Sequence, residues 1–271
     1  AVVARAAGRT LRVFVPPDGE PAVLRRLKEL EADVVTCVRE PRERGDPTYR
    51  ALRRALDDGA LPFTCQGPEN GLTVEGGETL AWEIVSDLRA ADAALDRVFV
   101  QVGGGALASS VVQGFEEAVE LDALPCAPRV HAVQTRGAFP LQRAYERVAR
   151  RIADGETAVE ALRYAARHRG EFMWPWEEDP RSVARGILDD ETYDWRAVVE
   201  GMLATGGSPV VVGEDVLRGA NDLAVRSTGV DVDPTGSAGL AGLISLRRAG
   251  EIEPGERVAV LFTGIRRDEG G

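Results

Sequence analysis

The segment VFVQVGGGALASSVVQGFEEA, at residues 98 to 118, constrains the fold more than any other stretch of the sequence. Its first five residues form a largely apolar run of strand length, and apolar positions then recur at helical spacing from Ala108 to Ala118. Three glycines, Gly103 to Gly105, lie at the junction. Such a turn lets backbone amides converge on an anion at the positive end of a helix, and the expected anion is a phosphate.

Two common phosphate motifs do not match this junction. The dinucleotide fingerprint G-x-G-x-x-G fits poorly, because residue 108 is alanine and no acidic residue follows at the usual distance after a second strand. The P-loop also fails, because no Gly-Lys-Ser or Gly-Lys-Thr follows the glycines. A tight turn that binds nothing therefore stays open as the alternative.

Strand-like and helix-like segments alternate along the whole chain, which predicts an α/β protein with parallel sheets and right-handed crossovers. The expected strands are 11–15, 33–38, 61–64, 98–102, 129–134, 209–213 and 257–264, and the expected helices are 1–7, 21–32, 49–56, 78–88, 108–118, 141–152, 157–168, 195–203 and 214–227, with a turn feeding a last helix within 232–246. The polar, turn-rich stretch 65–77 predicts a seam. We expect a smaller domain at residues 1–66 and a larger one at 67–271.

Composition narrows the classes of partner. The chain has 271 residues and a formal net charge of −11, which argues against nucleic acid or an anionic membrane as the main partner. It contains no apolar stretch near the roughly 20 residues needed to cross a bilayer. Cys37, Cys65 and Cys126 are far apart and odd in number, so neither a disulfide framework nor a zinc site is indicated and a reducing cytoplasm fits.

Other conspicuous residues have structural explanations. His131 and His168 are the two histidines of the chain, and neither lies in a pattern typical of a metal or nucleophile site. Trp174 and Trp176 either cap a cleft or anchor a surface loop. The last expected strand ends at Thr263, and in an open α/β sheet the ligand crevice lies at the carboxyl ends of the strands, where the glycine turn also belongs.

Five motifs in one order resemble the type II pyridoxal-phosphate enzymes, most closely threonine synthase and next the serine and threonine dehydratases. They are VGGGALASS (102–110), VHAVQTRGAFPL (130–141), SVARG (182–186), VDPTGSAGLAGL (232–243) and VLFTG (260–264). Two further segments, ENGLTVEGGETLAWEI (69–84) and AVVARAAGRTLRVFVPP (1–17), are similar to segments of the same enzymes. The resemblance therefore covers nearly the whole chain.

The resemblance implies a fold of two open, twisted, mostly parallel sheets covered by helices, and pyridoxal 5′-phosphate as cofactor. The amides of Gly103, Gly104, Gly105, Ala106 and Leu107 would hold the cofactor phosphate. Ala106 stands where the family has a fourth glycine, which requires a negative φ at that residue.

The resemblance also assigns the ring end of the cofactor. Thr263 would hydrogen-bond the pyridine nitrogen, and Asp233 takes the place of a glutamate near the ring in several relatives. A neutral hydroxyl at that nitrogen leaves the ring a weaker electron sink, which suits elimination and replacement at the β or γ carbon. A strand-end hydroxyl that satisfies a local amide is the alternative for Thr263.

The family also needs a lysine that forms a Schiff base with the cofactor. Lys28 is the only lysine of the chain, and it lies in an amphipathic helix where a solvated amine is a poor nucleophile at neutral pH. We expect the Schiff-base lysine upstream of residue 1, in an N-terminal part missing from this chain, so that no residue of this chain is assigned that role and residues 1–271 alone are inactive.

The intact protein would be a threonine synthase-like lyase that converts O-phosphohomoserine to threonine and phosphate. The alternatives are a serine/threonine dehydratase-like ammonia-lyase, a degenerate member that keeps the fold to bind a ligand, or a plain sugar- or nucleotide-binding domain. A small amino-acid substrate and a cytoplasmic homodimer are expected, and Arg136 and Arg181 stay candidates for the substrate site.

Overall fold

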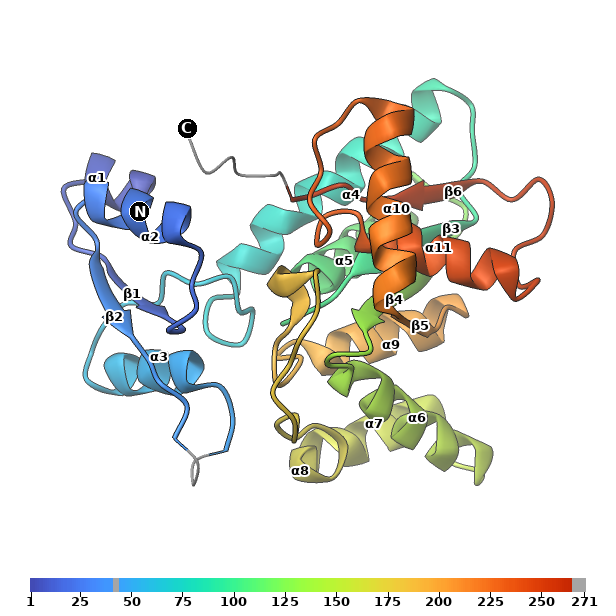
Figure 1. The fold of residues 1–271 in the computed structure, drawn as a ribbon. Helices are drawn as coiled ribbons and strands as arrows, with labels where there is room; N and C mark the ends of the chain where they lie inside the picture. The colour runs from blue at the N-terminus through green and yellow to red at the C-terminus, as the bar shows by residue number, and fades with distance from the viewer. Residues whose placement is uncertain (41–43, 265–271) are drawn as a thin grey trace. The chain divides into compact units, whose positions relative to one another are not determined.

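The computed structural model describes residues 1–40 and 44–264, which divide into two compact units (Figure 1). The first unit is Ala1–Pro62 and the second begins at Phe63, slightly before the boundary expected between residues 66 and 67. Each unit contains a parallel sheet with helices against it. The expected α/β class with two mostly parallel sheets is therefore confirmed.

The first unit is a small α/β layer. Its elements are α1 (Val2–Ala6), β1 (Arg12–Val15), α2 (Pro21–Glu29), β2 (Asp33–Thr36) and α3 (Pro47–Asp57). The two strands pair in parallel with Val13 opposite Val34, and α2 is the crossover between them. Helix α3 begins after Asp46, whose Oδ1 accepts a hydrogen bond from the Thr48 amide at 2.7 Å. This is an N-cap, and proline in the first turn adds to it.

The strand expected at residues 61–64 does not form. Leu61 is 88% exposed and Phe63 is 60% exposed, and the segment is irregular. Pro62 has no N–H to donate to a ladder, which disfavours strand pairing in this segment. The strand predicted from the apolar residues of this segment is therefore wrong.

The second unit is organised around a four-stranded sheet whose strands are all parallel. The strands are β3 (Arg97–Gln101), β4 (Arg129–Thr135), β5 (Pro209–Val212) and β6 (Val258–Val260), in the order β5-β4-β3-β6. Val98 lies opposite Val130 on one side and Ala259 on the other. The first strand of this sheet in the sequence thus pairs with the last, and their carboxyl ends lie side by side.

Helices cover both faces of this sheet (Figure 1). They are α4 (Leu72–Ala90), α5 (Ala106–Glu120), α6 (Pro140–Ala153), α7 (Ala158–Arg167), α8 (Arg169–Phe172), the 3-10 turn Arg185–Ile187, α9 (Trp195–Thr205), α10 (Glu214–Thr228) and α11 (Ala238–Arg248). Val98 and Val100 point into the core with α5 and α9, whereas Phe99 points into the core with α10 and α11. Because side chains alternate along a strand, Gln101 faces the α11 side with Phe99.

Helix α4 begins earlier than its sequence pattern predicts. The pattern predicts a helix at residues 78–88 after a polar loop, whereas the helix starts at Leu72 and includes both Gly76 and Gly77. A β-carbon at Gly77 would lie 2.7 Å from Cβ of Ser110 on α5. Close packing of the two helices therefore outweighs the low helix propensity of glycine, which is what misled the prediction.

Two kinds of feature are missing from residues 1–40 and 44–264. No helix there is long and apolar enough to span a membrane. No group of three or more histidine, cysteine or acidic side chains in the same residues is arranged to hold a metal ion.

Candidate functional site

The three-glycine turn joins β3 to α5 as predicted. Gly105 has φ +99°, a left-handed conformation in which a β-carbon is strained, so glycine is required there. The helix starts at Ala106, which is not among the described non-glycine residues with positive φ. Ala106 therefore has the negative φ that an alanine in place of the family's fourth glycine requires.

The backbone amides of this turn are available to an anion. Within residues 1–40 and 44–264, no backbone carbonyl accepts a hydrogen bond from the amides of Gly103, Gly104 or Gly105. Ala106 and Leu107 are in the first turn of α5, where amides have no partner within the helix. The positive end of the helix dipole adds to their attraction for negative charge.

A second segment, Ile187–Asp194, covers one side of the glycine turn. A β-carbon at Gly103 would collide with the Asp189 carboxylate and lie 2.9 Å from Cα of Ile187. A β-carbon at Gly104 would lie 3.1 Å from the ring of Tyr193. The glycines are therefore needed for this close approach as well as for the turn. No periodicity in the sequence indicates these contacts, although the acidic run LDDETYD at 188–194 is visible in it.

Negative charge lies close to the glycine turn. Burial raises the pKa of the Asp194 carboxyl, and the Gly67 amide, which donates to Asp194 Oδ2 at 3.2 Å, opposes that effect. Burial, and then the charges of Asp189 and Asp194, raise the pKa of the Cys65 thiol. A phosphate bound by the turn would therefore share its surroundings with Asp189.

Thr263 lies at the same edge of the sheet as the glycine turn. It follows β6, which pairs with β3. The amide nitrogen Nε2 of Gln101, the last residue of β3, donates a hydrogen bond to Thr263 Oγ1 at 2.5 Å. The structure thus brings the two sequence-predicted ends of one ligand site to neighbouring strand ends.

Asp233 caps the turn that leads into α11. Its Oδ1 accepts a hydrogen bond from the Gly236 amide at 2.6 Å, and its own amide donates to the carbonyl of Gly264 at 3.3 Å. A β-carbon at Gly264 would lie 2.7 Å from Cγ of Asp233. Asp233 therefore packs beside the residue that follows Thr263, where its carboxylate holds the local backbone.

The other candidates lie elsewhere. Lys28 is exposed on α2 of the first unit. Arg136 follows β4, and its amide donates to the Val212 carbonyl at 3.0 Å. Arg181 pairs with Asp179 at 3.2 Å on the surface. Within the described part of the second unit, no hydrogen bond or ion pair joins the side chain of Arg136 or Arg181 to the glycine turn.

The tryptophan segment holds an arginine of α6. The guanidinium of Arg143 lies 4.1 Å from the ring centre of Trp174 and 4.6 Å from that of Trp176. Arg143 also donates to Glu177 at 2.8 Å. These cation–π contacts favour the surface-loop interpretation of this segment.

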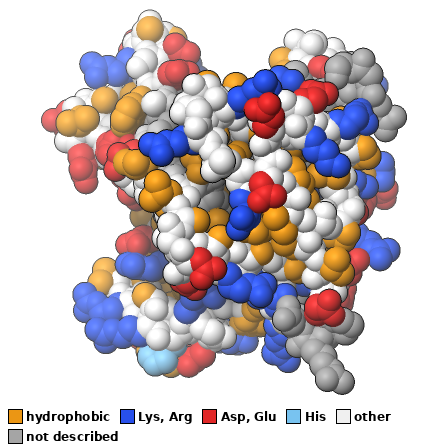
Figure 2. Space-filling view, turned by 90° about the vertical axis from the view of Figure 1, so that its left-hand side faces the viewer, with side chains coloured by type: hydrophobic (Ala, Val, Ile, Leu, Met, Phe, Trp, Pro, Cys, Tyr) orange, Lys and Arg blue, Asp and Glu red, His pale blue; other side chains and the backbone are white. Residues whose placement is uncertain are grey.

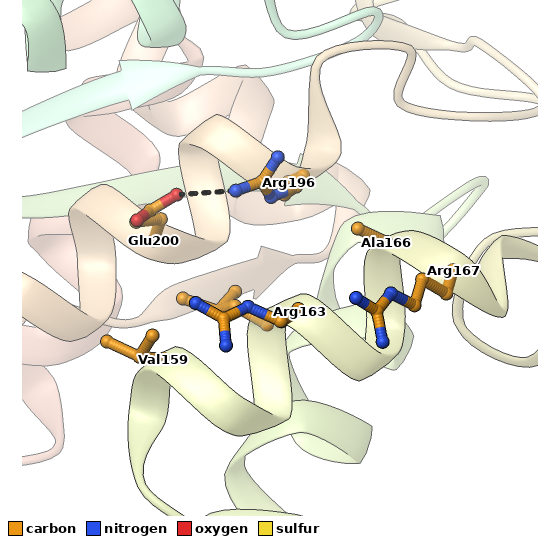
Figure 3. Close-up of a pocket in the computed structure, with 7 residues that line it drawn as sticks. Val159, Arg163, Ala166, Arg167, Arg196 and Glu200 are labelled. Carbon is orange, nitrogen blue, oxygen red and sulfur yellow. Dashed lines mark ion pairs between the residues drawn. The ribbon is translucent and has the colours of Figure 1, made fainter.

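A surface hollow of about 210 Å³ lies between α7 and α9 (Figure 3). Arg163 and Arg167 of α7 and Arg196 of α9 line it, and Arg196 pairs with Glu200 at 3.8 Å. No residue of the glycine turn takes part. On the face drawn in Figure 2, acidic and basic side chains are interspersed with neutral ones.

Comparison with known proteins relates the whole described chain to one family. A family model described as "Pyridoxal-phosphate dependent enzyme" matches residues 1–264. The threonine synthase of Methanocaldococcus jannaschii is 25% identical over 195 residues, which cover 72% of this chain and 42% of that protein. The threonine synthase of a Bacillus species is 26% identical over 219 residues, which cover 81% of this chain and 52% of that protein. The chain thus spans about half the length of these relatives.

Solved structures agree on the fold. A pyridoxal 5′-phosphate-dependent aspartate racemase superposes with a TM-score of 0.69 at 16% identity, covering 98% of this chain and 69% of the racemase. The processed form of threonine deaminase isoform 2 from Solanum lycopersicum superposes with a TM-score of 0.67 at 18% identity, covering 98% of this chain and 66% of the deaminase. At these identities the likeness concerns the fold alone.

Proposed function

Because the chain belongs to the pyridoxal-phosphate dependent enzyme family, we propose that the amides of Gly103–Leu107 hold the cofactor phosphate and that Thr263 meets the pyridine nitrogen. One observation carries the proposal. The glycine turn and Thr263 follow two hydrogen-bonded parallel strands, β3 and β6, at the same edge of the sheet. We infer that a single flat ligand lies across these neighbouring strand ends.

The residues present fit such a ligand at both ends. The left-handed Gly105 and the first turn of α5 provide amides without carbonyl partners among the described residues, which suits a phosphate. Thr263 is exposed, so its hydroxyl is accessible to a ring nitrogen. The Asp189 carboxylate beside Gly103 opposes the binding of an anion. We therefore expect a lower affinity than the amides alone would give.

We further propose threonine synthase-like chemistry for the whole protein, the elimination and replacement that turn O-phosphohomoserine into threonine and phosphate. The support is the similarity to threonine synthases over 72% to 81% of this chain. When bound, pyridoxal phosphate supplies an electron sink for the substrate carbon, and a ring nitrogen without a proton makes that sink weak enough to favour elimination. A serine/threonine dehydratase-like activity is the alternative.

The chain's own residues have distinct tasks in this proposal. The amides of the glycine turn would bind and position the phosphate through hydrogen bonds. The hydroxyl of Thr263 would donate a hydrogen bond to the ring nitrogen and so disfavour its protonation. The segment Ile187–Asp194 excludes water from one side of the turn, because its side chains touch the glycines.

We propose that residues 1–271 bind the cofactor without turning over substrate. Lys28 is the only lysine of the sequence and is exposed on α2 of the first unit. A solvated amine is protonated at neutral pH and is a poor nucleophile. Formation of threonine from O-phosphohomoserine by the purified chain with pyridoxal phosphate would overturn this proposal.

Binding and specificity are tested separately. Trp195 follows Asp194 directly, so tryptophan fluorescence can report a ligand in the glycine turn. Titration with pyridoxamine 5′-phosphate, which needs no lysine, should quench or shift this emission, and Thr263→Val should weaken binding severalfold. Absence of binding to the unaltered chain would refute the cofactor site. A longer form that contains a suitable lysine, assayed with O-phosphohomoserine, serine and threonine, would separate the synthase from the dehydratase.

A further inference from the structure

Gln101 is a buried amide at the point where the two halves of the proposed site meet. Its side chain is only 5% exposed, although it ends a strand whose other described side chains are mostly apolar. Its Nε2 lies within hydrogen-bonding distance of Thr263 Oγ1 at 2.5 Å and of the Leu261 carbonyl at 3.2 Å. The Gly236 carbonyl lies 3.3 Å from the same nitrogen.

The two carbonyls determine which way round the amide lies. A carbonyl oxygen can only accept, so the group that faces Leu261 and Gly236 must be the NH₂ and not the amide oxygen. The NH₂ group therefore also faces Thr263, and the Thr263 hydroxyl must be the acceptor in that hydrogen bond. The amide oxygen of Gln101 is buried on the other side and has no hydrogen-bond partner among the described residues.

The hydrogen bond from Gln101 leaves the proton of the Thr263 hydroxyl available to another acceptor. Once Thr263 Oγ1 accepts from Gln101, its own proton has to be donated elsewhere, and no described residue is recorded as its acceptor. The side chain of Thr263 is exposed, so the proton is offered to a ligand at the sheet edge. A hydroxyl held in this way can donate to a bare ring nitrogen and so satisfy its proton, whereas accepting from a protonated nitrogen through its remaining lone pair would leave that proton without an acceptor among the described residues.

We propose that Gln101 is a positioning residue that directs the Thr263 hydroxyl proton toward the cofactor ring, and so favours the unprotonated pyridine. This inference rests on the proposed function, since it needs a pyridine ring at Thr263. Gln101 itself need not touch the cofactor. It acts through Thr263, and Gly239, where a β-carbon would lie 3.3 Å from the amide oxygen, leaves room for it.

The test measures the pKa of the ring nitrogen in bound pyridoxamine 5′-phosphate by absorbance titration, because the protonated and unprotonated rings absorb at different wavelengths. In the unaltered chain we expect that pKa to lie about one unit or more below that of the free ligand. Gln101→Leu should return it toward the free value, because the hydroxyl is no longer held as a donor. Gln101→Met should have the same effect, because methionine keeps a similar side-chain length but has no N–H to hold the hydroxyl.

Controls separate this inference from the proposed function and from a merely structural role. Thr263→Val should abolish the lowering of the ring pKa, and Thr263→Ser should keep it. If Thr263→Val changes the ring pKa but both Gln101 variants keep the original value, Gln101 only supports the fold and the inference is wrong. If the unaltered chain does not bind the ligand, or Thr263→Val has no effect, the proposed cofactor contact fails and the inference fails with it. Melting temperatures identify any variant that does not fold. If one Gln101 variant does not fold, the ring pKa in the other variant tests the inference.

Discussion

The backbone amide of Asp194 donates a hydrogen bond to the carbonyl oxygen of Gly104, with 2.9 Å between the two atoms. The carbonyl and the N–H of one trans peptide unit point in opposite directions, so the N–H of Gly105 is turned away from Asp194. The segment that covers the glycine turn therefore also orients an amide on the opposite side of it. This geometry depends on the left-handed conformation of Gly105.

Replacement of Gly105 by alanine should weaken ligand binding much more than the same change elsewhere. Alanine at φ +99° is strained by about 1–2 kcal/mol, and relieving that strain rotates the peptide that orients the amides. We expect Gly105→Ala to lower the affinity for pyridoxamine 5′-phosphate by about tenfold or more, measured by calorimetric titration. Gly155→Ala is the matched control, because Gly155 has φ +108° and a β-carbon there meets nothing within 4 Å. Equal affinities in the two variants would contradict the assignment.

Removal of the Asp189 charge should strengthen the binding of anions. The carboxylate lies against Gly103, where it repels a phosphate in the turn. We expect Asp189→Asn to raise the affinity for inorganic phosphate and for pyridoxamine 5′-phosphate by about three- to tenfold at low salt, and less at high salt. Asp222→Asn, an exposed change on α10, is the control and should have no effect. Lower affinity in Asp189→Asn would show that Asp189 supports the ligand instead.

The sequence predicted the turn and the strand ends well because those features are local. The change from strand to helical periodicity around the three glycines can be seen within about 20 residues. Thr263 could be placed because parallel strands share their carboxyl edge, and β6 lies beside β3 as this requires. The positions of single elements followed from patterns of a few residues.

The remaining site contacts could not be predicted because they join distant parts of the chain. The contact of Asp194 with Gly104 spans a segment without any periodicity, so nothing local indicates it. Gln101 did give a signal, since it is a polar residue that interrupts the apolar run VFVQV, but its partner Thr263 lies 162 residues away. Helix α4 began early because Gly77 fits against Ser110, a packing effect that propensity alone does not contain.

A buried ion pair lies at the amino ends of the parallel strands β3 and β6, on the sheet edge opposite the glycine turn. Arg97 donates to Glu256 through Nε at 2.9 Å and through a terminal nitrogen at 3.0 Å, and these bonds lower the pKa of the Glu256 carboxyl. Because Arg97 is only 6% exposed, Glu256→Gln should leave a poorly compensated charge and lower the free energy of unfolding by about 2–4 kcal/mol. Glu251→Gln, on an exposed neighbouring side chain, should change it by less than about 0.5 kcal/mol. Urea unfolding of both variants provides the comparison, and a similar small loss in each would contradict the importance of the pair.

The same network makes stability depend on pH through His131. Burial, and then the charge of Arg97, lower the pKa of the His131 imidazole to about 4 from 6.5. Between pH 4 and pH 6.5 the unfolded chain therefore binds a proton at this histidine that the folded chain does not. The contribution of neutral His131 to the free energy of unfolding is fully present above pH 6.5 and is lost as the pH falls toward 4. The loss attributable to His131 is at most about 3 kcal/mol.

A non-titrating variant tests this dependence. Urea unfolding followed by tryptophan fluorescence at pH 7, 6 and 5 should show a shallower decline for His131→Gln than for the unaltered chain. All four tryptophans lie in the second unit, so this signal follows the unit that contains His131. His168→Gln, on an exposed histidine, should decline like the unaltered chain. Parallel curves for all three proteins would rule out a role for His131.

The pairing of the first and last strands of the larger sheet has a consequence during synthesis. A nascent chain that has emerged only as far as α11 already contains the glycine turn, but the Thr263 hydroxyl of the proposed site follows β6 and emerges later. Closing a contact over 162 residues is slow and comes late in folding. A ligand that contacts both strand ends would bind the finished sheet and not the partly formed one, so its binding would stabilise the folded sheet selectively.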